Sequence, residues 1–305
     1  MKIITLVILS VLIELSFVSE AIAVPLVKVI GSTVSKTIDP YRDDLKIQVK
    51  CSGWFDKSWF VNFSSEEIQV LDKQDSKGYY VQESTLSFAL PNDPAIESKD
   101  ALKKIYAVDD GYLVSYYAGE WGGSLWWFSK DGKNKKAVLP YKPTYDAISF
   151  VKEFMPTKDG LYLLVGLSHL SLDSGGIIKV ENTKEDGWRI SKHVNLSSAA
   201  LAYFKIDENA YLILTNKKVV YFSLKKGSMT LYEPLDGYPR SGVGGNSIAR
   251  DNQGNIFIGD RYKVTRLKPV LGGYSEEWII PEYCEWDVED NGICHCQSLS
   301  DVYKK

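Results

Sequence analysis

The sequence lacks the motifs by which most catalytic and nucleotide-binding proteins can be recognised. It has three histidines among 305 residues, no G-x-S-x-G nucleophile elbow and no G-x-x-x-x-G-K-[ST] phosphate loop. Charge of one sign is also missing, because 36 Lys and Arg face 39 Asp and Glu, a net charge of −3. A balanced chain has no basic surface for nucleic acid or anionic lipid. We therefore expect no nucleic-acid partner and no cofactor, and assign no catalytic residue.

Long apolar runs are missing everywhere except at the N-terminus. There Lys2 precedes an apolar run from Ile3 to Ile13, which Glu14 interrupts, and Ala21-Ile22-Ala23 follows as a small-x-small pattern. A membrane-spanning helix needs about 20 apolar residues, whereas this arrangement is typical of a secretory signal peptide. We expect residues 1–23 to be removed after Ala23 and the mature protein to be secreted or periplasmic, without stable membrane insertion. An uncleaved N-terminal anchor is the alternative.

Cysteine is scarce, and the four that occur lie near the two ends of the mature chain. Cys51 is near its start, while Cys284, Cys294 and Cys296 are near its end. In an exported chain disulfides are the simplest interpretation, and a bond from Cys51 to one of the other three would join the two ends. A metal site that includes His295 is the alternative, but the paired spacings of structural zinc sites are absent. We expect no metal and leave the pairing open among its three possibilities.

Aromatic residues, at 12%, favour β-strands. Four segments share an acidic turn, a small residue and an alternating apolar strand: 108–114, 158–164, 207–214 and 251–258. Each is interpreted as a hairpin whose turn takes positive φ at Gly or Asn. The turns lie at positions 111, 160, 210 and 254. Repeats of roughly 40–50 residues with several strands each are typical of propeller blades.

Further β-rich runs extend the repeat in both directions. Additional strands are predicted at Lys46–Cys51, Trp59–Phe63, Ile68–Leu71, Tyr79–Phe88 and Tyr274–Ile280. The prediction is an all-β fold: residues 24–44 as an N-terminal leader and 45–305 as a single β-propeller domain of five or six blades. Closing such a ring requires strands from both ends of the chain to share a blade. A pair of β-sandwiches is the alternative.

One segment resembles a known blade motif. Asp251-x-x-Gly254-Asn255-Ile256-Phe257-Ile258-Gly259 is similar, over about a dozen residues, to the blades of NHL-type, lactonase-type and two-component-sensor propellers. Lactonase-type propellers hold a divalent metal in the central channel through a Glu, Asn residues and an Asp. The resemblance would assign those roles to Glu120, Asn246 and Asp260, but function does not transfer with a fold.

The most distinctive stretch is 116–128, where glycines flank Glu120 and Trp121 on an expected loop and Trp126 and Trp127 follow on an expected strand. Tryptophan on a loop offers a large contact area at a low entropic cost, and protein interfaces favour it. Arg240 and Arg261 lie on two other predicted turns and could line the same face. The candidate binding residues are therefore Glu120, Trp121, Arg240 and Arg261.

The sequence leads to the expectation of an exported, periplasmic, non-enzymatic propeller that binds a protein partner, as an inhibitor, an immunity protein or a scaffold does. Two other functions stay open. One is a metal-dependent, lactonase-like hydrolase with its site in the channel. The other is a carbohydrate-binding module that uses the tryptophans as stacking platforms.

Overall fold

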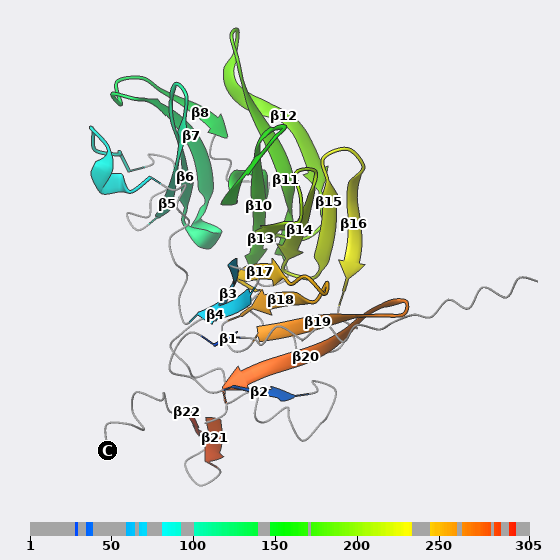
Figure 1. Ribbon diagram of the computed structural model, residues 1–305. Helices are drawn as coiled ribbons and strands as arrows, with labels where there is room; N and C mark the ends of the chain where they lie inside the picture. Colours follow the sequence, from blue (N-terminus) through cyan, green and yellow to red (C-terminus); the bar gives the residue numbers. More distant parts are fainter. Residues whose placement is uncertain are drawn as a thin grey trace, which may run out of the picture.

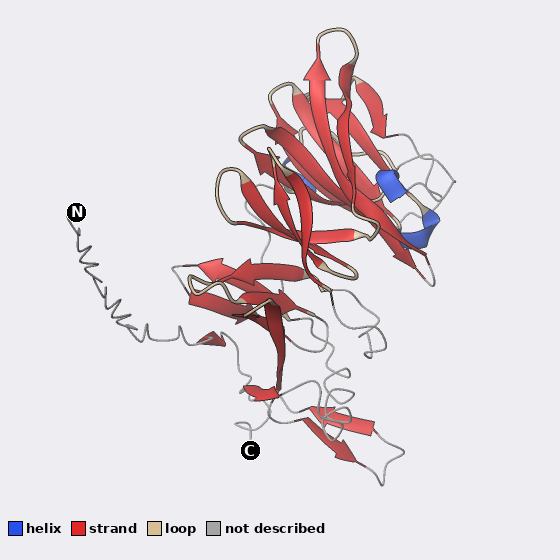
Figure 2. Ribbon diagram, turned by 90° about the vertical axis from the view of Figure 1, so that its right-hand side faces the viewer, coloured by secondary structure: helices blue, strands red, loops and turns tan. Residues whose placement is uncertain are grey.

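The computed structural model describes residues 28–29, 35–38, 59–64, 67–71, 81–92, 101–139, 147–169, 172–233, 245–260, 264–281, 284–287 and 293–296. The described part consists of strands, connecting turns and three short 3-10 helices (Figures 1 and 2). No helix within it is long and apolar enough to cross a membrane. The expected signal peptide, the leader as a unit and the strand at 46–51 lie outside these residues.

Sheets of antiparallel strands follow one another along the chain, and we number them I to V. Sheet I contains β3 (Phe60–Ser64) and β4 (Glu67–Leu71), with β1 (Lys28–Val29) added in parallel to β4. Sheet II is β5 (Leu102–Val108), β6 (Gly111–Tyr117), β7 (Gly123–Ser129) and β8 (Lys135–Leu139). Sheet III is β9 (Val151–Thr157), β10 (Gly160–His169), β11 (Leu172–Thr183) and β12 (Gly187–Asn195).

Sheets IV and V repeat the same four-stranded meander. Sheet IV is β13 (Ala200–Lys205), β14 (Ala210–Thr215), β15 (Val219–Ser223) and β16 (Gly227–Tyr232). Sheet V is β17 (Ser247–Arg250), β18 (Ile256–Gly259), β19 (Val264–Val270) and β20 (Gly273–Pro281). A separate hairpin, β21 (Cys284–Asp287) and β22 (Ile293–Cys296), follows. The four repeated turns in the sequence are the hairpins that join the first and second strands of sheets II to V.

The sheets pack face to face in the order II, III, IV, V, I. A separate cluster of buried apolar side chains fills each of the four interfaces. Examples, taken in that order, are Leu113 with Phe154, Met155 with Tyr211, Leu212 with Ile248, and Trp59 with Phe257. β3 of sheet I packs beside β17 of sheet V, so the first sheet of the chain contacts the last. Consecutive meanders stacked in this way are propeller blades, which confirms the predicted all-β, propeller-type fold.

Strands from both ends of the chain also meet in one blade. β2 (Ser35–Ile38) pairs antiparallel with β20 as the fifth, outermost strand of sheet V, with Thr37 opposite Ile279. The first sheet therefore packs on the last, and an N-terminal strand completes the last sheet. Strands from both ends of the chain therefore share a blade, which is the condition for ring closure named in the sequence analysis.

Two details of the prediction were wrong. The expected strand at 79–88 is, over its described part, an extended segment with a short 3-10 helix, η2 (Glu83–Thr85). Its apolar residues cover the face of sheet II that points away from sheet III: Phe88 packs against Phe128 with ring centroids 5.9 Å apart. The third repeated turn, unlike those at Gly160 and Gly254, has no residue with positive φ. Its Asp207 carboxylate accepts the Asn209 N–H at 2.6 Å.

Candidate functional site

The repeated acidic turns all lie at one rim of the sheets, where first and second strands meet, and their carboxylates have internal partners. Asp251 is 5% exposed and accepts the backbone N–H groups of Gln253 and Asn255, at 3.0 and 2.8 Å. The side-chain amide of Asn255 donates to its second oxygen at 2.7 Å. These bonds fix the turn in the manner of an Asx turn, so the carboxylate is structural.

Two other carboxylates of this rim connect neighbouring strands. Asp159 accepts the Tyr162 hydroxyl at 3.0 Å and lies 3.2 Å from the Lys179 ammonium, and the hydrogen bond from Lys179 is the main reason that its pKa is lowered. Asp110 of sheet II accepts the Asn182 amide and the Trp188 indole N–H of sheet III, at 2.8 and 3.2 Å. This second carboxylate therefore joins two blades.

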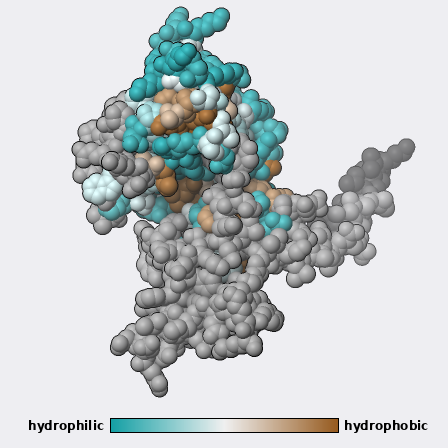
Figure 3. Space-filling view, turned by 90° about the vertical axis from the view of Figure 1, so that its left-hand side faces the viewer, coloured by the Kyte–Doolittle hydropathy of each residue, from teal (hydrophilic) through white to brown (hydrophobic). Residues whose placement is uncertain are grey.

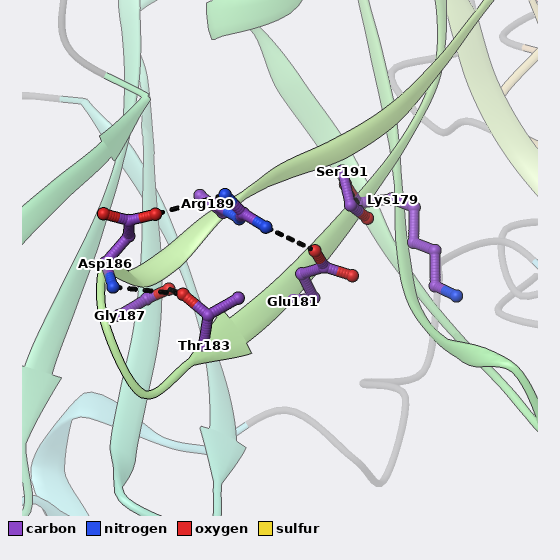
Figure 4. Close-up of polar contacts among 7 residues, drawn as sticks. All are labelled: Lys179, Glu181, Thr183, Asp186, Gly187, Arg189 and Ser191. Atoms are coloured by element: carbon purple, nitrogen blue, oxygen red, sulfur yellow. Dashed lines mark hydrogen bonds and ion pairs between the residues drawn. The ribbon is translucent and has the colours of Figure 1, made fainter.

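In the long β11–β12 hairpin, which projects at the top of Figure 1, charged side chains also form ion pairs with one another. Arg189 lies between Asp186 and Glu181, with N–O distances of 3.1 and 3.3 Å (Figure 4). The Thr183 hydroxyl accepts the Asp186 N–H at 3.1 Å and closes the turn. The charges drawn around this turn are therefore already satisfied and offer little to a ligand.

The opposite rim, at the junction of sheets II and III, carries an exposed tryptophan. The loop between β6 and β7 forms a 3-10 helix, η3 (Gly119–Trp121), as the sequence predicted for a loop at this place. Backbone hydrogen bonds from Ala118 to Gly122 (2.9 Å) and from Trp121 to Ala118 (3.2 Å) hold it. The Trp121 side chain is 69% exposed. Of Glu120 the structure places the backbone, in the same helix.

Lys152, near the start of β9, contacts Tyr117, the last residue of β6, which leads into this helix. Its ammonium donates a hydrogen bond to the Tyr117 hydroxyl and lies 3.7 Å from the centroid of the Tyr117 ring. The Tyr117 ring in turn meets Phe150 edge-on, with centroids 6.3 Å apart. Burial lowers the pKa of Lys152 to about 8 and raises the pKa of Tyr117.

Gly123 permits this approach of the two sheets. A Cβ at this position, the first of β7, would lie 2.6 Å from the carbonyl oxygen of Ser149. That oxygen belongs to η4 (Ala147–Ser149), the turn that leads into β9. Since no side chain separates the two backbones, Phe150 and Lys152 can lie against the end of β6.

Lys152 differs from two other lysines that lie between blades, Lys104 and Lys217. Lys104 forms an ion pair with Glu153 at 3.1 Å, and Lys217 forms one with Asp173 at 3.3 Å. Across the described part of the chain, by contrast, the contacts of the Lys152 ammonium are to Tyr117, a neutral phenol. It is thus a half-buried cation without a carboxylate among the described residues.

Apolar side chains complete the surface. Leu102, 71% exposed, lies opposite Tyr117 in the β5–β6 register, and Leu172, at the start of β11, is 40% exposed. Figure 3 shows apolar side chains reaching the surface among polar ones on the side that carries sheet II. We call the set Leu102, Tyr117, Trp121, Lys152 and Leu172 the II–III rim. Lys152 was not among the residues predicted from the sequence, where its only signal is a lysine within an apolar strand.

The other candidates have mixed outcomes. Arg240 and Arg261 lie outside the described residues. Asn246 and Asp260 lie together at one end of sheet V, where the Asn246 N–H donates to Gly259 at 2.8 Å and the Asp260 carbonyl accepts the Trp59 N–H at 2.9 Å. In the described residues no group of three or more His, Cys, Asp and Glu side chains could hold a metal ion.

The structure describes the backbone of three of the four cysteines. Cys284 and Cys296 are direct partners in the β21–β22 register, and Cys294 lies opposite Trp286. Cys51 lies outside the described residues.

Comparisons with known proteins assign no family to this chain. No protein-family model matches the chain, and no curated protein matches it. Among solved structures, the extracellular domain of a hybrid two component system from B. thetaiotaomicron is 19% identical, with a TM-score of 0.37 over 76% of this chain and 26% of that one. A hemopexin fold protein from cow pea is 8% identical, with a TM-score of 0.24 over 57% of this chain and 90% of that one. Both TM-scores are low, so the architecture rests on the sheets and their packing.

Proposed function

We propose that this protein is an exported, non-enzymatic propeller that binds a protein partner of the cell envelope through the II–III rim, as an inhibitor, immunity protein or scaffold. The observation that carries the proposal is Trp121, 69% exposed on a helical turn that backbone hydrogen bonds fix in place. Export follows from the signal peptide expected over residues 1–23.

The energetics of the rim suit binding. An exposed tryptophan contributes nothing to the core, but its burial in a partner would remove a large apolar area from water. Because η3 already holds its backbone, little conformational entropy would be lost on association. Anchors of this kind carry most of the binding energy of an interface.

The neighbours of Trp121 favour a protein over a sugar as the partner. Sugar rings stack on flat aromatic faces, whereas Leu102 and Leu172 are exposed aliphatic side chains of the kind that pack against other apolar side chains. The II–III rim also contains a cation, Lys152, whose described contacts include no carboxylate. A protein surface can supply both apolar side chains and a complementary charge.

The test is co-purification of the tagged protein from its own envelope fraction, with two variants in parallel. Trp121→Ala removes the proposed anchor. Met229→Ala removes a side chain that is 59% exposed on β16, the edge strand of sheet IV, and that is not part of the II–III rim. We expect Trp121→Ala to reduce the recovered partner by at least about tenfold and Met229→Ala to leave it unchanged. Equal recovery with both variants would overturn the proposal.

A further inference from the structure

The Lys152 ammonium is poorly compensated in the free protein. It is withdrawn from water between sheets II and III, and among the described residues its partner is the Tyr117 phenol. A cation taken out of water is costly unless an opposite charge accompanies it. Burial lowers the pKa of Lys152 to about 8, and no carboxylate among the described residues opposes this shift.

Two carboxylates on the elements around Lys152, Glu153 and Asp173, have other partners. Lys104 on β5 donates to the Lys152 carbonyl oxygen at 2.6 Å and pairs with Glu153, the next residue of β9. Asp173 on β11 accepts from Ser198 and Ala199 and pairs with Lys217. His169 ends β10, and Glu120 lies in η3. Glu120 carries the charge opposite to that of Lys152, and the Glu120→Gln variant below tests whether it is the counter-ion.

We propose that Lys152 and Tyr117 form a carboxylate-binding point, at which an aspartate or glutamate side chain of the protein partner docks beside Trp121. The inference rests on the proposed function and names the chemistry of the partner. The carboxylate would accept one hydrogen bond from the ammonium and one from the phenol, and both would be charge-assisted. The adjacent Trp121 and Leu102 would bury the apolar surface around that acidic side chain.

This geometry couples binding to protonation. The carboxylate needs the ammonium form of Lys152, which the free protein loses near pH 8. Binding should therefore raise the pKa of Lys152, and affinity should fall with rising pH above about 8, by up to tenfold per unit. A purely apolar contact at Trp121 would show neither effect.

The probe is benzoate, which joins a carboxylate to an apolar ring, and benzamide is its matched neutral control. The readout is the pH titration of Lys152 followed by NMR at the Cε position in protein labelled with [¹³C]lysine, with Lys152→Met identifying the signal. We expect millimolar benzoate to raise the pKa of Lys152 by about one unit, and benzamide to leave it unchanged. An unchanged pKa in benzoate overturns the inference.

Glu120→Gln separates an internal counter-ion from an external one. If Lys152 is free to bind a carboxylate, this variant keeps the wild-type titration and the benzoate response. If the response appears only in Glu120→Gln, Glu120 is the partner of Lys152 and the inference is wrong. Loss of co-purification in Trp121→Ala together with no benzoate response would leave the proposed function standing and refute the carboxylate site alone.

Discussion

The two rims of the blades use charge in opposite ways. At the acidic-turn rim, Asp110, Asp159 and Asp251 each have partners that close a turn or join neighbouring strands and blades. At the II–III rim, Lys152 is a half-buried cation with a phenol beside it, and Trp121 is a large apolar side chain exposed to water. The carboxylates of the repeated turns are therefore structural. Lys152 lies outside these turns and has no carboxylate among its described contacts, so it is the better candidate for function.

The contrast between satisfied and unsatisfied charges predicts that satisfied carboxylates matter for stability, and this includes Asp173, which lies at the end of sheet III opposite the acidic turns. The largest effect is expected for Asp173→Ala, because the Asp173 side chain is 6% exposed and accepts both the Ser198 hydroxyl and the Ala199 N–H. Leaving these buried donors unpaired should lower the free energy of unfolding by about 3 kcal/mol, measured by urea denaturation. Asp173→Asn keeps one acceptor oxygen and should lose less. Equal stability of all three proteins would mean that the cluster is not structural.

Asp251→Ala should have the next largest effect, a loss of about 2 kcal/mol, since three hydrogen bonds of the β17–β18 turn end on this carboxylate. The same measurement on Asp131→Ala is the control. Asp131 also accepts hydrogen bonds within a turn, from Ser129 and Lys133, but it lies in water. We expect little change there, and a loss as large as that of Asp251→Ala would remove the distinction between buried and exposed turns.

The half-buried Lys152 should give the protein a distinctive pH dependence. Below pH 8 the folded protein holds a charge in an unfavourable place, whereas the unfolded chain keeps that proton to about pH 10.4. The unfolded state thus binds more protons between these values, and stability should rise with pH by about 1–3 kcal/mol. Lys152→Met should lack this rise in thermal unfolding between pH 8 and 10. The range ends there because buried tyrosines, such as Tyr162 with its pKa raised to about 12, destabilise the fold at higher pH.

Trp121→Ala should change stability least of all, by less than about 0.5 kcal/mol, because the side chain is 69% exposed. Its thermal unfolding should superimpose on that of the wild type, although its partner binding is lost. A marked destabilisation would show instead that Trp121 packs within the fold, and the difference between the two rims would disappear.

The fold could be predicted largely from local signals. The acidic turns and alternating strands give the blade repeat because each hairpin is specified by adjacent residues. The segment 81–92 could not be assigned in this way, since its apolar residues cover the outer face of sheet II without pairing as a predicted strand. The local sequence is the same for an apolar segment that pairs as a strand and for one that covers the face of a sheet.

The candidate site was predictable only in part. Trp121 was identified because a tryptophan between glycines on a loop is unusual in itself. Lys152 was missed because its importance depends on Tyr117, 35 residues away along the chain. The contrast with Lys104 and Lys217 also depends on which carboxylates the folded chain brings to each lysine. Such relations exist only in the packed blades.

The most direct test of the central claim is site-specific photo-crosslinking in the native envelope. A benzophenone amino acid is placed at position 121 or at position 229, one per protein, and illuminated in intact cells. The account predicts a discrete cross-linked protein from position 121 and none from position 229. Cross-linking of the same protein from position 229 alone, or from both positions equally, would contradict binding through the II–III rim.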